Sequence, residues 1–242
     1  MTACKFLDRR MAAEYVVKHY GVPGIFELNQ TLETVMNNVV VFGGTGEVGQ
    51  IVVEKLLARD RIVKILTRNE TSKSNHTNLS VIKGNVLEAS TVEQCIESHD
   101  IVIIALGFNN SGLDTMSKGT ANIVTVMLGK KCNRLICLSA QGAGDSWEHM
   151  PDTFKTMVSN DPILTASFKD HTLQEQVVKN SNLNWTIVRP TEIVNEIESG
   201  GYCVNDYKDN LTFQISKYDV AQFIVDEISN NAYVNKVAMI TN

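Results

Sequence analysis

The chain has 242 residues, of which 43% are hydrophobic and 20% are charged. This balance is ordinary for a globular protein and excludes a chain that stays disordered for lack of apolar surface. The longest uninterrupted apolar run, Ile101–Leu106, is far shorter than the ~20 residues of a membrane-spanning helix. A formal net charge of −5 provides no overall positive field for nucleic acid or anionic lipid. We therefore expect neither a membrane nor a nucleic acid as a partner.

The cysteines argue against both a metal site and a disulfide framework. The five cysteines are widely spaced, odd in number and without a Cys-x-x-Cys pair. A reducing, cytoplasmic compartment is the simplest expectation. Cys137 falls inside a predicted strand, where a buried, inert thiol is expected. His171 has no second His or Cys at ligand spacing, so we expect no metal there.

Residues 1–36 form a predicted N-terminal extension. Residues 9–19 carry apolar side chains at helical spacing, and Val22-Pro23-Gly24 ends the predicted helix. Asp8-Arg9-Arg10 interrupts the apolar core that a secretory signal requires. We expect a helical appendage packed on the domain or on a partner subunit, with a targeting role as the alternative.

From residue 37 onward, short apolar runs alternate with helical patterns. The predicted strands cover 39–42, 62–66, 81–82, 101–106, 134–138, 185–188 and 237–240, and the predicted helices cover 47–59, 90–97, 116–130, 168–179 and 219–228. Such alternation implies parallel strands joined by right-handed crossovers. We therefore predict an α/β fold in which residues 37–242 form a single doubly wound, Rossmann-type parallel sheet with helices on both faces.

Two helix starts carry capping signals. Ser90, with Glu93 three residues later, predicts a capping box. Ser216 or Asp219 is the predicted cap of the last helix.

The clearest chemical signal follows the first predicted strand, where Gly43, Gly46 and Gly49 precede a helix. In a dinucleotide site the first glycine allows the tight turn, the second lets backbone approach a pyrophosphate, and the third lets the helix lie close to the sheet. The N–H groups at the helix start add donors and a partial positive charge. We predict a dinucleotide site here, the alternative being a purely structural turn.

Arg68 indicates which nicotinamide cofactor is bound. It ends the second predicted strand, about 20 residues past the glycines, where an acid normally meets the ribose hydroxyls of NAD. An arginine at this place suits a 2′-phosphate instead. We predict NADPH, and a solvated basic residue is the alternative reading.

Several segments together resemble a known family. They are Phe42–Gly46, Gly84–Leu87, Asp100–Gly107, Met116–Gly119, Asp170-His171, Arg189-Pro190 and Ile215–Lys217. In this ordered set the chain resembles the atypical short-chain dehydrogenases of the NmrA-like, NAD(P)-binding group. Within that group it is most similar to the flavin reductase and biliverdin reductase beta type.

The resemblance implies cofactor and substrate contacts at matched positions. It places Thr45, Gly46, Glu47 and Val48 along the pyrophosphate, Arg68 at the adenosine phosphate, Asn85 and Val86 beside the adenine, and Leu106 and Gly107 at the ribose and phosphate linker. It also brings Met116 and His171 to the cofactor, Ser139 beside the nicotinamide, and Pro190, Thr191, Glu192 and Ile193 into the wall of the nicotinamide pocket.

Two departures from the family pattern bear on these roles. Asn85 replaces the usual Asp and still allows a hydrogen bond to adenine. Thr191-Glu192 replaces Pro-His, so the predicted substrate pocket gains a carboxyl group. An anionic tetrapyrrole would be repelled by an ionised Glu192, which leaves the identity of the acceptor open.

The chain lacks the Tyr-x-x-x-Lys pair of short-chain dehydrogenases, since no tyrosine has Lys four residues later. That pair delivers a proton to a developing alkoxide, so its absence disfavours alcohol or ketone chemistry. Flavins and linear tetrapyrroles delocalise the incoming charge, and positioning with a proton from solvent then suffices. Ser139 is the predicted catalytic residue, hydrogen-bonding the acceptor or the carboxamide; the alternative is a hydroxyl that caps the strand end.

Two functions remain open. The first is an NADPH-dependent oxidoreductase acting on a planar conjugated acceptor, as a monomer or weak homo-oligomer. The second is a non-catalytic NAD(P) sensor of the NmrA-like type. The missing Tyr/Lys pair fits either.

Overall fold

The computed structural model describes residues 38–69, 76–107, 114–195, 201–205 and 213–242. The predicted N-terminal helix lies outside these described residues. The division into a 1–36 extension and a 37–242 domain therefore stays a prediction. The description below concerns residues 38–242.

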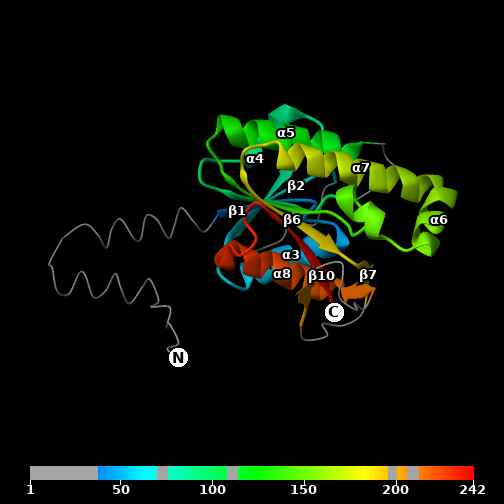
Figure 1. Ribbon diagram of the computed structural model, residues 1–242. Coiled ribbons are helices and arrows are strands. Elements are labelled where there is room, and N and C mark those ends of the chain that lie inside the picture. Colours follow the sequence, from blue (N-terminus) through cyan, green and yellow to red (C-terminus); the bar gives the residue numbers. More distant parts are fainter. Residues whose placement is uncertain (1–37, 70–75, 108–113, 196–200, 206–212) are drawn as a thin grey trace, which may run out of the picture. The chain divides into compact units, whose positions relative to one another are not determined.

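Eight of the described strands form one sheet (Figure 1). They are β1 (Asn38–Phe42), β2 (Ile62–Thr67), β3 (Leu79–Lys83), β4 (Ile101–Ile104), β5 (Arg134–Leu138), β6 (Asn184–Pro190), β8 (Cys203–Asn205) and β10 (Lys236–Thr241), in the order β3-β2-β1-β4-β5-β6-β10-β8. All neighbours pair in parallel except β8, which runs antiparallel to β10. Two further strands, β7 (Glu192–Val194) and β9 (Gln214–Ser216), form a small parallel sheet. The strand order reverses direction between β1 and β4, which makes this the place where ligands bind in doubly wound sheets.

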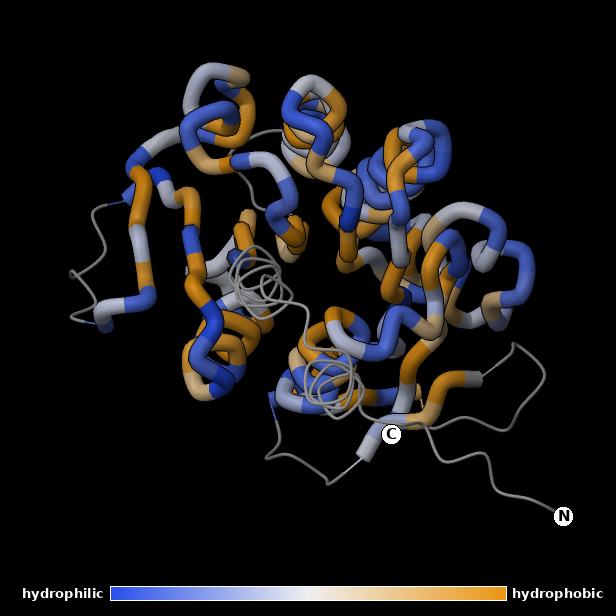
Figure 2. The backbone as a smooth tube through the Cα atoms, turned by 90° about the vertical axis from the view of Figure 1, so that its left-hand side faces the viewer, coloured by the Kyte–Doolittle hydropathy of each residue, from blue (hydrophilic) through white to orange (hydrophobic). Residues whose placement is uncertain are grey.

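Helices cover both faces of the sheet (Figure 1). On one face lie α3 (Glu47–Leu57) and α8 (Lys217–Asn230), and on the other lie α4 (Ala89–Cys95), α5 (Thr115–Gly129) and α7 (Pro162–Lys179). The 3₁₀ helix η1 (Gly144–His149) and α6 (Asp152–Asn160) connect β5 to α7. Figure 2 shows hydrophilic and hydrophobic stretches within the same helices, as amphipathic helices on a buried sheet require. The predicted doubly wound fold is confirmed.

The central strands supply side chains to two separate cores. In β1, Val39 and Val41 pack with α3 and α8, whereas Val40 and Phe42 pack in the core on the α4 and α5 side. Because alternate side chains of a strand point to opposite faces, a strand buried on both faces must be apolar throughout. Each such side chain contributes about 1.5–3 kcal/mol on burial.

The second half of the fold differs from the sequence prediction at several helix starts. Helix α7 begins at Pro162 instead of residue 168, because Asp161 caps it by accepting hydrogen bonds from the N–H groups of Ile163 (2.8 Å) and Leu164 (3.1 Å). Proline at the first helical position fits this start, since its missing N–H has no partner there anyway. The sequence prediction did not include α6.

Of the two predicted caps, one is wrong and one is confirmed. The capping box at Ser90 is wrong, because α4 begins one residue earlier, at Ala89, after Glu88. Here the Thr91 hydroxyl donates to the carbonyl of Asn85 (2.7 Å), which ties the helix start to the preceding turn. Ser216 is confirmed as the cap of α8, accepting from the N–H of Tyr218 at 3.2 Å.

Candidate dinucleotide-binding site

The turn between β1 and α3 is built around two glycines that admit no side chain. Gly43 has a φ of +86°, and a Cβ there would overlap the carbonyl of Ala105 at the end of β4. A Cβ on Gly49 would overlap the carbonyl oxygen of Gly43, so the first turn of α3 lies directly against the loop. The turn is closed by a hydrogen bond from the N–H of Gly46 to the Gly43 carbonyl (2.9 Å). The turn and the close approach predicted for these two positions are present.

Helix α3 starts without a side-chain cap. Its N-cap residue is Gly46, which has no side chain to accept from the first N–H groups. Thr45 and Gly46 are both exposed at this point. An uncapped helix start with a partial positive charge is a binding site for an anion such as a diphosphate.

A cavity of about 380 Å³ lies beside this turn, at the carboxyl ends of β1, β2, β3 and β4. It brings together eight of the predicted cofactor residues: Gly43, Thr45, Gly46, Arg68, Asn85, Val86, Leu106 and Gly107. The remaining lining residues are Phe42, Leu66, Thr67, Asn69, Gly84, Leu87, Ala105 and Thr115. The cavity therefore lies at the switch point of the sheet, as expected for a dinucleotide.

The far end of the cavity combines an apolar wall with exposed polar groups. Val86 is buried against Gly119 of α5, where a Cβ would come within 2.8 Å of the valine methyl group. The Val86 carbonyl accepts from Asn122 Nδ2 (3.0 Å), which fixes this turn to α5. The Asn85 side-chain oxygen accepts from the N–H of Leu87 (3.1 Å), and Arg68 is exposed at the end of β2. An apolar surface for a ring beside a cation suits an adenosine phosphate.

The other predicted cofactor residues lie outside the cavity lining. Glu47 is exposed in the first turn of α3, whereas Val48 is packed in the core. Met116 is fully buried in the first turn of α5. His171, on α7, has its Nδ1 atom 3.3 Å from Gln174 Oε1. The roles of these residues in binding stay predictions.

Asp170 of α7 caps α5. Its two carboxylate oxygens accept from the N–H groups of Met116 (2.9 Å) and Ser117 (3.0 Å). About one helical turn further along the same buried face, Gln174 donates to Thr120 of α5 at 3.2 Å. Helices α5 and α7 are thus held together by buried polar contacts as well as apolar ones.

The residues of the predicted substrate pocket lie at and beyond the carboxyl end of β6. Pro190 ends β6, and its carbonyl accepts from the N–H of Gln141 (2.9 Å). Thr191 is buried, with its hydroxyl 3.4 Å from that of Thr241. Glu192, on β7, is exposed and its Oε2 accepts from Gln214 Nε2 at 3.3 Å.

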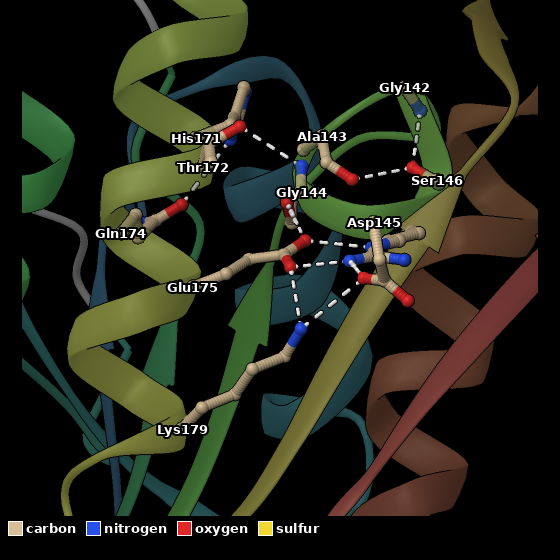
Figure 3. A network of polar contacts seen from close by, with 12 residues as sticks. Gly142, Ala143, Gly144, Asp145, Ser146, His171, Thr172, Gln174, Glu175 and Lys179 are labelled. Atoms are coloured by element: carbon tan, nitrogen blue, oxygen red, sulfur yellow. Dashed lines mark hydrogen bonds and ion pairs between the residues drawn. The ribbon is translucent and has the colours of Figure 1, made fainter. Parts of the chain in front are cut away.

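Ser139 belongs to a buried polar network that the sequence prediction did not include; Figure 3 shows Asp145, Glu175 and Lys179 of this network. Its hydroxyl donates to Glu175 Oε1 of α7 at 2.8 Å. Arg189 of β6 donates to both oxygens of the same carboxylate, from Nε at 2.8 Å and from Nη2 at 2.5 Å. Lys179 adds a contact to Oε2 at 3.2 Å, and Arg189 also binds Asp145 of η1 at 2.6 Å. One signal was in the sequence, namely an arginine directly after the predicted strand residues 185–188.

Arg189 and Glu175 are almost completely buried, with exposed fractions of 0% and 1%. Burial alone would raise the pKa of the Glu175 carboxyl group, but the hydrogen bonds and charge of Arg189, with smaller contributions from Ser139 and Lys179, outweigh it and hold the pKa below its usual value. The carboxylate is therefore ionised at neutral pH, and it is fully paired.

Two further expectations concern cysteine and metal. Cys137 is buried, as predicted, and burial raises the pKa of its thiol well above the usual range, so it is not a nucleophile at neutral pH. Within the part of the chain that the structure describes, no group of three or more His, Cys, Asp or Glu side chains is placed to hold a metal ion. None of the described helices is long and apolar enough to cross a membrane.

Comparison with known proteins agrees with the geometry of the cavity. A profile of the family described as NAD(P)H-binding matches residues 43–231. The UPF0659 protein YMR090W of Saccharomyces cerevisiae is 22% identical over 223 residues, covering 84% of this chain and 92% of that protein.

Two solved structures share the fold. ChuY of Escherichia coli O157:H7, described as an anaerobillin reductase, has a TM-score of 0.71 at 20% identity, covering 84% of this chain and 96% of ChuY. A short-chain dehydrogenase/reductase of Veillonella parvula, solved in complex with NADP, has a TM-score of 0.73 at 21% identity, covering 85% and 94%. With the family profile spanning most of the chain and the cavity at the switch point of the sheet, this chain belongs to the NAD(P)H-binding family of Rossmann-fold proteins.

Proposed function

We propose that this protein is an NADPH-dependent reductase of a planar conjugated acceptor such as a flavin or a linear tetrapyrrole. The observation that carries the proposal is the cavity beside the glycine turn, which has Arg68 in its lining. The site suits a phosphorylated dinucleotide, because an uncapped helix start and an arginine both line it.

The residues of the cavity divide the work of binding. Thr45 and Gly46 offer the backbone and hydroxyl donors of the turn to the diphosphate. Arg68 binds the 2′-phosphate, and Val86 provides the apolar surface for the adenine. NADPH, when bound, supplies a hydride, and solvent supplies the proton that completes the two-electron reduction of the acceptor.

The missing Tyr-x-x-x-Lys pair favours an acceptor that needs little acid–base help. Flavins and tetrapyrroles spread the incoming charge over a conjugated system, so orientation of the two rings can supply most of the acceleration. The similarity in fold to an anaerobillin reductase supports an acceptor of this kind. We further propose that the protein acts in the cytoplasm as a monomer or weak homo-oligomer.

The test is NADPH oxidation, followed by absorbance, with FMN, FAD, riboflavin or biliverdin as the acceptor. We expect turnover with at least one of them, and a slower rate with NADH. Ser139→Ala should lower the rate. Exposed Glu192 tests the substrate pocket, since Glu192→Gln should raise the rate with an anionic tetrapyrrole more than with riboflavin.

A second candidate is a non-catalytic NAD(P) sensor. It is favoured by the missing Tyr-x-x-x-Lys pair, and by the Ser139 hydroxyl proton, which is donated inward to Glu175. If the protein binds NADPH tightly but consumes none of the four acceptors, the sensor is supported and the reductase is contradicted.

A further inference from the structure

Ser139 lies at the edge of the sheet where the second half of a dinucleotide would pass. It follows β5 directly, and its N–H donates to the Val188 carbonyl of β6 at 2.7 Å. The neighbouring strand β4 leads into Ala105, Leu106 and Gly107, which line the cavity. In a doubly wound sheet a dinucleotide crosses the switch point, so its nicotinamide half extends from the end of β4 over the ends of β5 and β6.

The direction of the Ser139 hydroxyl proton follows from its partner. An ionised carboxylate can only accept hydrogen bonds. The four contacts of Glu175 come from Ser139, from two nitrogens of Arg189 and from Lys179, and the last three are permanent donors at neutral pH. The Ser139 proton must therefore lie on the line from its Oγ to Glu175 Oε1.

The surrounding residues hold the hydrogen bond from Ser139 to Glu175 in this direction. Glu175 is 1% exposed, so water does not compete for its oxygens. Gly144 closes the other side, where a Cβ would come within 2.9 Å of both Arg189 Nη2 and Glu175 Oε2. The Gly144 N–H donates to Thr172 Oγ1 at 3.0 Å, which holds η1 against α7 (Figure 3).

We propose that Glu175, held by Arg189, is a positioning residue that turns the Ser139 hydroxyl inward, so that Ser139 Oγ meets a bound ligand only as a hydrogen-bond acceptor. A serine hydroxyl has one proton and two lone pairs, and here the proton is already used. The ligand group opposite Ser139 must then be a donor. Ser139 does not stabilise a developing oxyanion, because that would require the proton.

This inference deepens the proposed function and rests on it for the identity of the ligand. The required chemistry is an N–H donor. Two sources fit: the carboxamide NH₂ of the nicotinamide, or a ring N–H of the planar acceptor. Both are absent from simple ketones and aldehydes, which present only an oxygen.

The test compares ligands that differ in that N–H alone. In the cofactor arm, calorimetry measures Kd for NADP⁺ and for its 3-acetylpyridine analogue, in which a methyl group replaces the NH₂. In the acceptor arm, kcat and KM are measured for lumiflavin and for 3-methyl-lumiflavin with NADPH. The proteins are the wild type, Ser139→Ala, Glu175→Gln and the control Ser181→Ala.

Ser181 is a matched control because it is a serine with almost the same burial, 4% exposed against 3%, at the opposite end of the sheet between α7 and β6. Its hydroxyl donates to the Val178 carbonyl at 2.6 Å. Ser181→Ala should lower the melting temperature but keep the ligand preferences of the wild type.

The wild type should prefer the N–H ligand about 5- to 10-fold in one of the two arms, the value of one hydrogen bond. The arm in which this happens identifies the donor as cofactor or acceptor. Ser139→Ala should abolish the preference. Glu175→Gln should reduce it although the hydroxyl is still present, because the amide can donate to one lone pair of Ser139 Oγ and free the Ser139 proton. Ser139→Ala leaves the Glu175–Arg189 pair intact, so it tests the acceptor role of Ser139 even if Glu175→Gln does not fold.

The inference is wrong if the wild type shows no preference in either arm, or if Ser139→Ala keeps it. Failure of the proposed function has a different signature. If the protein prefers NADP⁺ to its 3-acetylpyridine analogue but reduces no acceptor, the proposed reductase activity is wrong and the proposed role of Ser139 is supported.

Discussion

Arg68 is the single side chain on which the choice between the two pyridine nucleotides depends. Arg68→Ala should lower the affinity for NADPH at least about 10-fold, since a hydrogen bond to a charged group contributes about 1.5–3 kcal/mol. Because NADH lacks the 2′-phosphate, the affinity for NADH should fall by less than about 2-fold. Fluorescence titration of both cofactors checks this.

Arg59→Ala provides the control for that titration. Arg59 follows α3 and pairs with Asp226 of α8 at 2.9 Å, outside the cavity lining. The substitution Arg59→Ala should leave the affinities for NADPH and for NADH unchanged. Equal losses for NADPH and NADH in Arg68→Ala would show that Arg68 does not read the phosphate.

His171 makes the stability depend on pH. Burial lowers the pKa of its imidazole below the usual ~6.5, although contacts with Gln174 and nearby carboxylates act the other way. Below pH ~6.5 the unfolded chain therefore binds more protons than the folded one, and stability falls as the pH drops. We expect the melting temperature to fall from pH 7 to pH 5, and to fall less in His171→Gln.

At the scale of single residues, the sequence predicted most of the cofactor-binding residues that line the cavity, but it did not predict the polar network that Ser139 joins. The glycine spacing and Arg68 carry their meaning locally, because each follows a strand. Glu175 does not, because a glutamate within a helix is normally solvent-exposed. Its burial depends on Arg189, 14 residues later on a different element. Only Arg189 itself, next to apolar strand residues, hinted at a buried partner.

Among the elements, the start of α3 is the one on which the site depends most. Gly49→Ala should lower stability by about 1–3 kcal/mol, because the new methyl group must displace the Gly43 carbonyl. The same displacement disturbs the turn, so NADPH affinity should fall as well. Chemical denaturation and cofactor titration on the same sample measure both effects.

Gly129→Ala is the matched substitution in a helix. Gly129 ends α5, and a Cβ there meets nothing within 4 Å. Alanine should leave NADPH binding unchanged and raise stability by up to about 1 kcal/mol, because it favours helix more than glycine does. If Gly49→Ala likewise left NADPH binding unchanged, the close approach of α3 to the loop would not be needed for binding the cofactor.

Most elements from residue 38 onward could be predicted, because apolar runs and helical periodicity are local properties. The misses share a physical cause. The three-residue strands β7, β8 and β9 are too short to show a period, and they exist only because a neighbouring strand pairs with them. Helix α6 has nine residues and buries a single side chain, Val158, so its apolar pattern is too short to identify a helix from the sequence alone.

For the molecule as a whole, the cofactor should act as a stabilising ligand. NADPH at 100 times its Kd adds about 2.7 kcal/mol to the free energy of unfolding. For a domain of this size that corresponds to a rise in melting temperature of about 5–10 °C. NADH at the same concentration should give a smaller rise. Thermal unfolding followed by circular dichroism measures both, and no rise with either nucleotide would contradict the binding site.

The face that α7 turns toward the sheet has a consequence for chain length. Asp170, Gln174 and Glu175 lie within about one and a half helical turns. Each contacts a different part of the fold: the start of α5, the body of α5 and the end of β5. Deleting or inserting one residue between them would rotate half of this face by about 100°. All three attachments cannot then be kept, so we expect this short segment to tolerate substitution far better than any change in its length.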